Sequence, residues 1–287
     1  MKPMPRTLPV LLSAALAGSL SFATLLTAAH ARQAGNDSTY SWTYQYKKGT
    51  TVRLRGRMAI TGEIKQEVNG KTETTPINVE IRSLNKQEVK SVAANGDANV
   101  QDTTEQYEIR IDNNPPNPHD KPQPVTRTIS KTGQILKQQV AREDAQAQNA
   151  QVEALSFILS EMIAPDKPIK IGETWKSELN NRFVEGQKVT QTSTLVSAEK
   201  IAGVDALKVK VQMSVPTKVN ADEKYTLKLD GAYYVDPKDG RKIRADFDLE
   251  NLPLSTQAGE LIVKASYHVA QIIPGFNDKE DTADKGK

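Results

Sequence analysis

Apolar and polar residues alternate with a period of two along most of the chain after residue 51. Successive side chains of a strand point to opposite faces, so this period predicts strands with one buried and one solvated face. Strands of that kind are typical of antiparallel sheets. The clearest runs place apolar residues on one face at 52, 54, 58 and 60, at 77, 79 and 81, at 107, 109 and 111, and within 207–213, 225–229, 243–249 and 261–269.

Turn signals connect these runs. Residues 236–240 place Pro237 at the first position of a turn and Gly240 where the backbone needs a positive φ. Residues 130–133, which end at Gly133, repeat this signal in the first half of the chain. The strands are therefore expected to follow one another as meanders. Two further hairpin candidates are Asn69-Gly70 and Asn95-Gly96.

One helix is expected to interrupt the strands, over residues 141–163. Its second half carries apolar residues at helical spacing, and Pro165 and Pro168 stop it. The helix covers the apolar face of the sheet in either of two interpretations: as the cover of a packed core, or as a lid over a hydrophobic cavity. The apolar positions are Val152, Leu155, Leu159, Met162 and Ile163.

The predicted fold class is mainly β (α+β), with antiparallel curved sheets or an open barrel and one central amphipathic helix. The helix separates two halves that each begin with a Trp, at Trp42 and Trp175, and reach a glycine-containing hairpin. A duplication of one unit would explain this similarity. The expected organisation is a signal peptide (1–31), a first β half (32–140), the helix (141–164), a second β half (165–276) and a disordered tail (277–287).

The first 31 residues have the order of a secretory signal peptide. Lys2 and Arg6 precede an apolar run over 8–26, and the small residues Ala29 and Ala31 resemble a cleavage site. Pro, Ser and Gly residues interrupt the run, which makes a permanent membrane span the weaker interpretation. We expect cleavage after Ala31, a periplasmic or secreted location, and no transmembrane anchor in the mature protein.

Composition excludes several classes of site and partner. The chain has no Cys, so disulfides, thiolate metal sites, cysteine nucleophiles and a bacterial lipoprotein anchor are absent. Without Lys2 and Arg6, 36 basic residues face 35 acidic ones, a net charge of +1. That balance does not suggest a nucleic-acid partner. Glycine-rich phosphate-binding motifs are also missing, and no cofactor is expected.

No catalytic or metal-binding residue is predicted, and the chain is not expected to be an enzyme. His119 lies in a proline-rich loop, and His268 falls on the solvated face of the last strand. No G-x-S-x-G or H-E-x-x-H motif supports either residue. Of the calcium-ligand positions before Gly240, only Asp239 carries a suitable side chain, so an ordinary turn is the better interpretation.

Two charged stripes are expected to be solvated sheet faces. One is basic and the other acidic, and oppositely charged residues occur on strands predicted to lie nearby. Individual exposed ion pairs of this kind are weak. The basic stripe is Arg53, Arg55 and Arg57, with Glu80 and Glu108 as candidate partners. The acidic stripe is Asp246, Asp248 and Glu250, with Lys208, Lys210, Lys224 and Lys228.

The segment from Pro168 to Trp175, PIKIGETW, resembles the Pro-(Val/Ile)-Lys-x-Gly-(Asp/Glu)-x-Trp motif of uncharacterised exported bacterial proteins. In that family the motif follows a helix and opens a block of antiparallel strands. Gly172 allows a turn, and Trp175 supplies a large apolar anchor. The expected architecture is also similar to that of the open-barrel carriers of lipoproteins and lipids in bacterial envelopes. The resemblance implies a fold but no substrate residue.

Two functional hypotheses follow. The first is a non-enzymatic exported envelope protein that binds an apolar ligand, such as a lipid, or a protein segment on the helix-covered face. The alternative is a structural or interaction module without a ligand cavity, which engages an envelope protein through sheet edges or the proline-rich loop at 113–123. In the first hypothesis the residues expected to line the face are Leu155, Leu159, Met162, Trp175, Val209, Leu227 and Phe247. A dry packed core made of the same residues is the competing interpretation.

Overall fold

A computed structural model describes residues 38–68, 71–112, 114–118, 122–140, 150–218, 224–256 and 259–273. The predicted signal peptide, the C-terminal tail, the Asn69-Gly70 turn, His119 and the first nine residues of the predicted helix lie outside these ranges. Those predictions therefore remain untested.

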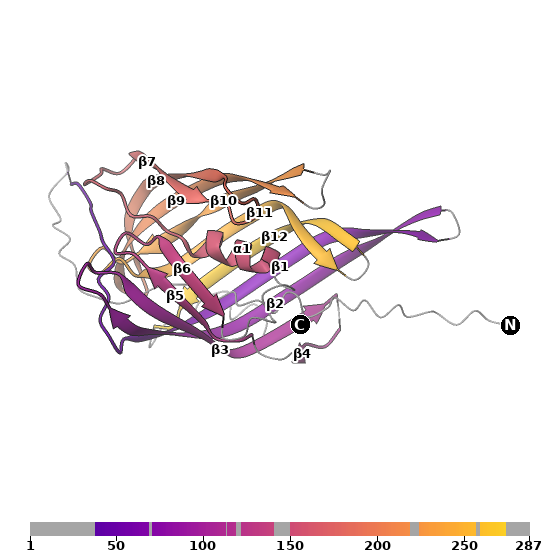
Figure 1. The fold of residues 1–287 in the computed structure, drawn as a ribbon, viewed down its shortest axis with the longest axis horizontal. Helices are drawn as coiled ribbons and strands as arrows, with labels where there is room; N and C mark the ends of the chain where they lie inside the picture. The colour runs from indigo at the N-terminus through magenta and orange to yellow at the C-terminus, as the bar shows by residue number, and fades with distance from the viewer. Residues whose placement is uncertain are drawn as a thin grey trace.

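The described residues form one antiparallel sheet and one α-helix (Figure 1). The sheet order is β6-β5-β3-β2-β1-β12-β11-β10-β9-β8-β7, with β4 paired to β3 beside this path. Strands β6 and β7 are the two ends of the order, so the sheet is open. The elements are β1 (Thr51–Val68), β2 (Lys71–Val92), β3 (Ala98–Ile111), β4 (Asn117–Pro118), β5 (Val125–Ile129), β6 (Ile135–Val140), α1 (Ala150–Ser160), β7 (Thr174–Asn180), β8 (Lys188–Ile201), β9 (Val204–Lys218), β10 (Lys224–Val235), β11 (Lys242–Thr256) and β12 (Gly259–Gln271).

The mainly β, antiparallel prediction is confirmed, but the two halves belong to one continuous sheet. Strand β1 pairs with β12, with Met58 opposite Tyr267, and this pairing joins the first half to the second. The similarity of the halves stays a prediction. Their glycine hairpins occupy different places in the meander, since Gly133 lies between β5 and β6 and Gly240 lies between β10 and β11.

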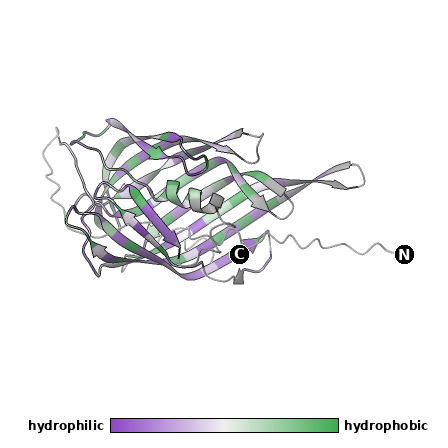
Figure 2. Ribbon diagram, viewed as in Figure 1, coloured by the Kyte–Doolittle hydropathy of each residue, from purple (hydrophilic) through white to green (hydrophobic). Residues whose placement is uncertain are grey.

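The period-two pattern sets the two faces of the sheet. In β9, Leu207, Val209 and Val211 are at most 1% exposed, while Lys210 between them is exposed. Hydrophobic and hydrophilic positions consequently form alternating bands across the strands (Figure 2). Each large apolar side chain that is buried on this face stabilises the folded state by roughly 1.5 to 3 kcal/mol. The apolar face is the inner face of the curved sheet, on the side of α1 (Figure 1).

The predicted turns are present, and their glycines have the positive φ angles that such turns need. Gly240 has a φ of 73°, and its N–H donates to Asp236 O at 2.8 Å. The Asp236 carboxylate accepts from the N–H of Lys238, which makes this an ordinary turn. Gly133 and Gly96 also have positive φ values, of 93° and 91°. The Gly96 turn spans the residues between Val92 and Ala98, so it is longer than the predicted two-residue connection.

Helix α1 ends earlier than predicted, at Ser160 rather than Ile163. The chain leaves the helix where the Glu161 carboxylate accepts a hydrogen bond at 3.0 Å from the N–H of Ile135, the first residue of β6. Pro165 also disfavours helical geometry in the residue before it. Helix α1 lies along the inner face of the sheet, between the arm that carries β5 and β6 and the arm that carries β7 to β10 (Figure 1).

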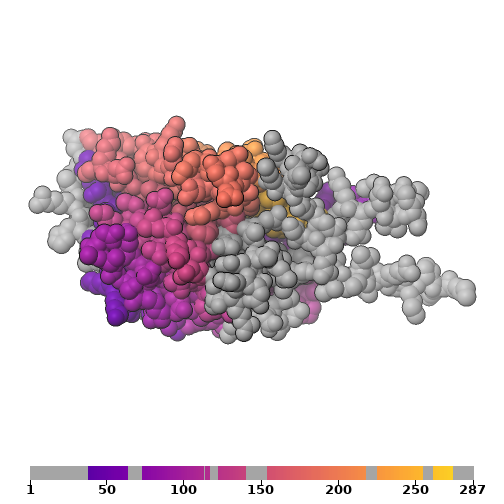
Figure 3. All heavy atoms as spheres, in the orientation of Figure 1, coloured from indigo at the N-terminus to yellow at the C-terminus, as the bar shows by residue number. Residues whose placement is uncertain are grey.

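Residues 40–46 close one end of the curved sheet, at the left of Figure 1. Tyr44 N donates to Lys131 O at 2.8 Å, and Gln45 N lies 3.4 Å from Asp239 O. The segment therefore runs between the β5–β6 turn and the β10–β11 turn, which belong to opposite arms of the sheet. In the space-filling view the two arms and the chain between them form a continuous surface at this end (Figure 3).

The proline-rich loop contains a two-residue strand. Asn117 and Pro118 form the short strand β4, in which Asn117 lies opposite Ile109 of β3 and Pro118 opposite Glu108. Proline cannot donate to a ladder, so it is tolerated at such a peripheral position.

Candidate functional site

The inner face of the sheet brings the predicted lining residues into one apolar cluster. Six of the seven are at most 5% exposed and belong to the main hydrophobic core, whereas Trp175 is partly buried and packs against that core. Whether they line a ligand site stays a prediction. The six buried residues are Leu155, Leu159, Met162, Val209, Leu227 and Phe247.

Trp175 occupies the beginning of β7, as the PIKIGETW motif predicts. Its ring meets the Trp42 ring edge to face, with centroids 5.8 Å apart, and its Nε1 donates to Ile163 O at 3.1 Å. Gly172 has a φ of 90°, which confirms the predicted turn. The motif thus joins the segment after α1 to the N-terminal segment at the closed end.

The apolar inner face is much longer than α1. The helix has 11 residues and is about 16 Å long. Strand β10, with 12 residues, is about 40 Å long, and β1, with 18, is about 59 Å. Leu227 lies eight residues before Val235 on β10, about 26 Å along the strand from the closed end. The helix therefore spans only part of the apolar face.

A charged cluster lies inside the same face, under α1. Arg127 of β5, Asp102 of β3 and Lys242 of β11 have exposures of 0%. The Arg127 guanidinium pairs with the Asp102 carboxylate and donates to Ser156 Oγ of α1 at 2.8 Å. Breaking such a buried pair leaves an uncompensated charge and is strongly destabilising. The cluster ties the two arms of the sheet to the helix.

Lys242 contacts the C-terminal end of α1. Its Nζ donates to Leu159 O at 3.3 Å, where the helix dipole favours a positive charge. Burial and the neighbouring charge of Arg127 together lower the pKa of Lys242 to about 7, although Asp102 opposes the shift. A small change in the surroundings of this ammonium group therefore changes its charge near neutral pH.

Glu161 is a second buried titratable group beside the helix. It is 4% exposed, and burial raises its pKa to about 7. The hydrogen bond from Ile135 and the charges of Arg182 and Lys188 oppose that shift. Arg182 lies 4.1 Å over the ring of Phe157, which adds a cation–π contact to the same end of the helix.

These interior charges were missed by the sequence analysis, although part of the signal was present. Arg127 has the same alternation phase as Val125 and Ile129, and Asp102 has the phase of Val100. A charged residue at an inward-facing position of a strand indicates either that the strand is interrupted there or that the charge has a buried partner. Lys242 gives no such signal, because the register between β10 and β11 shifts at Tyr234/Val235.

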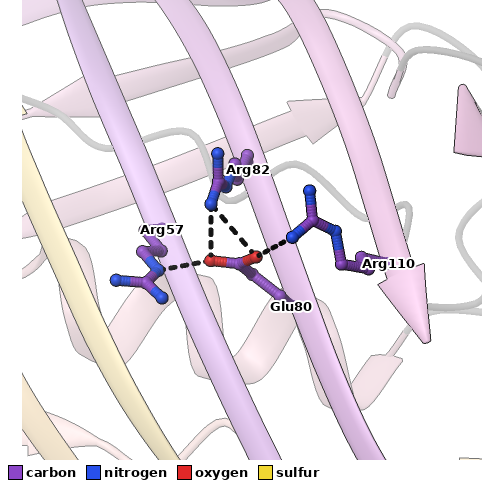
Figure 4. A network of polar contacts seen from close by, with 4 residues as sticks. All are labelled: Arg57, Glu80, Arg82 and Arg110. Carbon is purple, nitrogen blue, oxygen red and sulfur yellow. Dashed lines mark hydrogen bonds and ion pairs between the residues drawn. The ribbon is translucent and has the colours of Figure 1, made fainter. Parts of the chain in front are cut away.

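The outer face carries the predicted cross-strand ion pairs, with some changes of partner. Arg57 Nε lies 2.5 Å from the Glu80 carboxylate, which Arg82 and Arg110 also approach, at 3.2 and 3.9 Å (Figure 4). Figure 4 shows the four side chains converging from three adjacent strands. Arg53 instead pairs with Glu105. The interpretation of this stripe as a solvated face with paired charges is confirmed for Arg53 and Arg57.

The acidic stripe on β11 is paired in part. Glu250 lies 3.7 Å from Lys228 as predicted, whereas Asp246 binds Arg244 at 2.8 Å and His268 at 2.5 Å. Although partial burial opposes the shift, the hydrogen bonds from His268 and Arg244 hold the pKa of Asp246 below its usual value. The His268 side chain lies on this outer face as predicted, and it is 15% exposed.

A shallow hollow of about 580 Å³ lies on this outer face, between β1 and β8. Small side chains such as Ala59, Ala232 and Ser266 line it together with charged ones. Within the described ranges, no three His, Cys, Asp or Glu side chains form a group suited to hold a metal ion. Nor does the helix in those ranges have the length and apolar character needed to cross a membrane.

Comparisons with known proteins do not assign the chain to a family. No family model matches it, and no curated protein does. A structure of lipid–protein interactions in lipovitellin has a TM-score of 0.47 and 11% identity, and the match covers 82% of this chain but only 26% of that one. The chain thus spans about a quarter of lipovitellin.

Two further structures align over most of their length with lower scores. DynF from the dynemicin biosynthesis pathway of Micromonospora chersina has a TM-score of 0.24 and 10% identity, with 89% of this chain and 99% of DynF covered. A DUF1329 family protein from Desulfovibrio piger has a TM-score of 0.13 and 12% identity, with 80% of this chain and 88% of that protein covered. The membership suggested by the PIKIGETW motif stays a prediction.

Proposed function

We propose that this protein is an exported, non-enzymatic carrier that holds an apolar ligand, such as the acyl chain of a lipid, between α1 and the inner face of its sheet. The observation that carries the proposal is the mismatch between a helix of about 16 Å and an apolar face that extends about 40 Å along β10. An open sheet can present such a face to a ligand, whereas a sandwich covers it with a second sheet.

The closed end supports the same proposal. Residues 40–46 bind the turns of both arms, so the curved sheet is closed at that end. Leu227 and Leu229 of β10 lie toward the other end, and both are at most 2% exposed. A chain-like ligand would extend along the strands from that end and take the place of the protein groups that now cover these side chains.

Gentle mass spectrometry of the protein tests this proposal. The full gene is expressed in a bacterial host, and the protein is purified from the periplasm without detergent. We expect the mass of residues 32–287 together with a lipid-sized adduct. An adduct-free mass, with no binding of added dodecanoate or dodecanol, would overturn the carrier proposal. Recovery of the uncleaved chain from the cytoplasm would overturn the proposed export.

A pair of adjacent substitutions locates the binding face. Leu227→Trp adds bulk to the inner face of β10, and Lys228→Trp places the same side chain on the outer face. We expect Leu227→Trp to weaken ligand binding by at least about tenfold and Lys228→Trp to leave it unchanged. If the face is a packed core, Leu227→Trp instead costs about 1 to 3 kcal/mol of stability, and the wild type binds no ligand.

An interaction module remains a second candidate because the sheet is open. Strands β6 and β7 each pair on one side only among the described residues. A partner chain can add a strand to such an edge. This candidate predicts that a proline substitution at an outward-facing N–H of β7 abolishes partner capture, while retention of apolar ligand is unchanged.

A further inference from the structure

Strand β7 forms one margin of the sheet and presents an edge of its main chain. It pairs with β8 alone among the described strands, and it lies at the upper margin of the sheet in Figure 1. Leu195 N of β8 donates to Glu173 O at 3.0 Å. Bonding residues alternate along an antiparallel pair, so the odd-numbered residues of β7 bond to β8 and the even-numbered ones point their N–H and C=O groups away from it. The outward-pointing residues are Thr174, Lys176, Glu178 and Asn180.

The two margins of the sheet differ in accessibility. At the β6 margin, the N–H of Ile135 donates to the Glu161 carboxylate at 3.0 Å, so the chain that leaves α1 occupies part of that margin. Among the described residues, no other element forms a main-chain hydrogen bond with the outward-pointing groups of β7. Such a row of unpaired N–H and C=O groups is a template for pairing with another strand.

A hollow of about 410 Å³ lies along the first half of this edge. Thr174 and Lys176 of β7 border it on one side, and Pro165 and Lys167 of the segment before β7 border it on the other. The hollow gives another strand room beside the main chain of β7.

The sequence of β7, TWKSELN, is complementary to itself when it is read backwards about Ser177. An antiparallel pair of two copies, with a two-fold axis at Ser177, sets Lys176 of each copy opposite Glu178 of the other. Both side chains are exposed, and neither has an ion-pair partner among the described residues. Opposite charges at facing positions stabilise an antiparallel pair, whereas like charges destabilise it.

The same register satisfies the main chain and the inner face. All of its hydrogen-bonded pairs consist of outward-pointing residues, and each pair exchanges two bonds, about eight in all. On the inner side, the partly buried Trp175 of one copy faces Leu179 of the other. An axis moved to Lys176 or to Glu178 would set like charges opposite each other, so the charges select the register centred on Ser177.

We propose that two copies of this protein associate by antiparallel pairing of their β7 strands about Ser177, which joins their sheets into one. The partner is a second copy of this chain because the edge is complementary to its own sequence, as the single patch of a two-fold interface must be. The inference goes beyond the carrier function and does not depend on it. A pair of strands with seven residues each is a small interface, so the dimer is weak and depends on protein concentration.

Sedimentation velocity of the mature protein, purified from the periplasm, tests this inference. We expect a monomer at about 1 µM and below, and conversion to a dimer with a Kd of about 10 to 100 µM. Unfolding measured at or below about 1 µM therefore reports on the single chain. A protein that stays monomeric up to about 500 µM would overturn the inference.

Charge reversals at the edge locate the interface. Lys176→Glu sets glutamates opposite each other, and Glu178→Lys sets lysines opposite each other. Each variant alone should dimerise at least about tenfold more weakly than the wild type. An equimolar mixture of the two variants should form a heterodimer with the wild-type affinity, because every facing pair again has opposite charges. The double variant, with both reversals in one chain, should recover the homodimer for the same reason.

The controls separate the β7 edge from other causes of association. Because Lys176 and Glu178 are exposed, the variants should keep the circular dichroism spectrum of the wild type. Lys264→Glu, at an exposed position of β12, should dimerise like the wild type. A dimer that survives both single reversals overturns the assignment to β7, and so does a mixture of the two variants that stays monomeric.

The outcomes are independent of the proposed function. A protein that dimerises but carries no lipid-sized adduct and binds no dodecanoate or dodecanol overturns the carrier function and leaves this inference standing. A monomeric protein with a bound adduct overturns this inference and leaves the carrier function standing.

Discussion

The phenol group of Tyr44 donates a hydrogen bond to the main-chain carbonyl of Met162, at 3.0 Å and across 118 positions of sequence. This bond joins the N-terminal segment to the chain that leaves α1, at the closed end of the sheet. The Tyr44 side chain is 4% exposed, and burial raises its pKa well above the usual value. The hydroxyl therefore stays protonated and remains a donor over the physiological pH range.

Removing that hydroxyl should loosen the closed end. Tyr44→Phe leaves the Met162 carbonyl without its partner inside the protein, which we expect to cost about 1 to 3 kcal/mol of unfolding free energy. Urea denaturation measures the change. Tyr40→Phe is the matched control, since Tyr40 joins the same segment to Ile169 through main-chain bonds. Equal stability of the two variants would show that the Tyr44 bond contributes nothing.

Gly133 should tolerate no side chain. A Cβ at this position would lie 2.1 Å from Met162 O and 2.5 Å from the Tyr44 ring, in a backbone with a φ of +93°. We expect Gly133→Ala to cost more than about 3 kcal/mol, because the clash adds to the backbone strain. Gly203→Ala has a similar φ of +80° and open space around it, so strain alone should cost about 1 kcal/mol. Thermal denaturation of both variants separates the two contributions.

Glu161 should make stability fall as pH rises through the weakly acidic range. Its pKa is about 7 in the folded protein and about 4.5 in the unfolded chain, so the folded state binds more protons between those values. The difference amounts to about 3 kcal/mol, lost between pH 4.5 and 7. Glu161→Gln keeps an oxygen for the Ile135 N–H and should remove this loss.

Urea denaturation at several pH values from 4.5 to 8 measures that dependence for the wild type and the Glu161→Gln variant. The exposed Glu178 of β7 provides the control substitution, Glu178→Gln, which should keep the wild-type profile. Parallel profiles for the wild type and Glu161→Gln would contradict the prediction.

The buried pair of Arg127 and Asp102 should behave as a unit. Asp102→Leu leaves the guanidinium buried without its carboxylate, and we expect a loss of about 3 to 5 kcal/mol. The double variant Asp102→Leu with Arg127→Met should recover most of that loss, because both charges are gone. A double-mutant cycle by urea denaturation gives the coupling. Additive effects of the two single substitutions would show that the pair is not coupled.

The fold was largely predictable because its signals are local. Alternation assigns Val209 and Lys210 to opposite faces through strand geometry alone, whatever the strand packs against. Gly240 and Gly172 mark turns because only a glycine adopts a positive φ without strain. The early end of α1 was not predictable, since it depends on a hydrogen bond from Ile135, a residue of another strand.

The candidate site was predictable only in its apolar part. The alternation and the helical spacing place Leu159, Val209 and Leu227 on buried faces, and the structure gathers them into one core. The charged part was missed because a single arginine at an apolar position, such as Arg127, resembles an interruption of the strand. Its meaning depends on Asp102, which lies 25 positions away in sequence and is brought close by the pairing of β3 with β5.

The amino-acid sequence by itself determined the strands, their buried faces and their turns, because each depends on residues within a few positions of one another. Only the tertiary structure decided that β1 pairs with β12, that residues 40–46 close one end, and that Arg127 and Lys242 meet α1 inside the sheet. These relationships depend on contacts between residues far apart in sequence. Such contacts form only when the curvature of the whole sheet brings its two arms together around the helix.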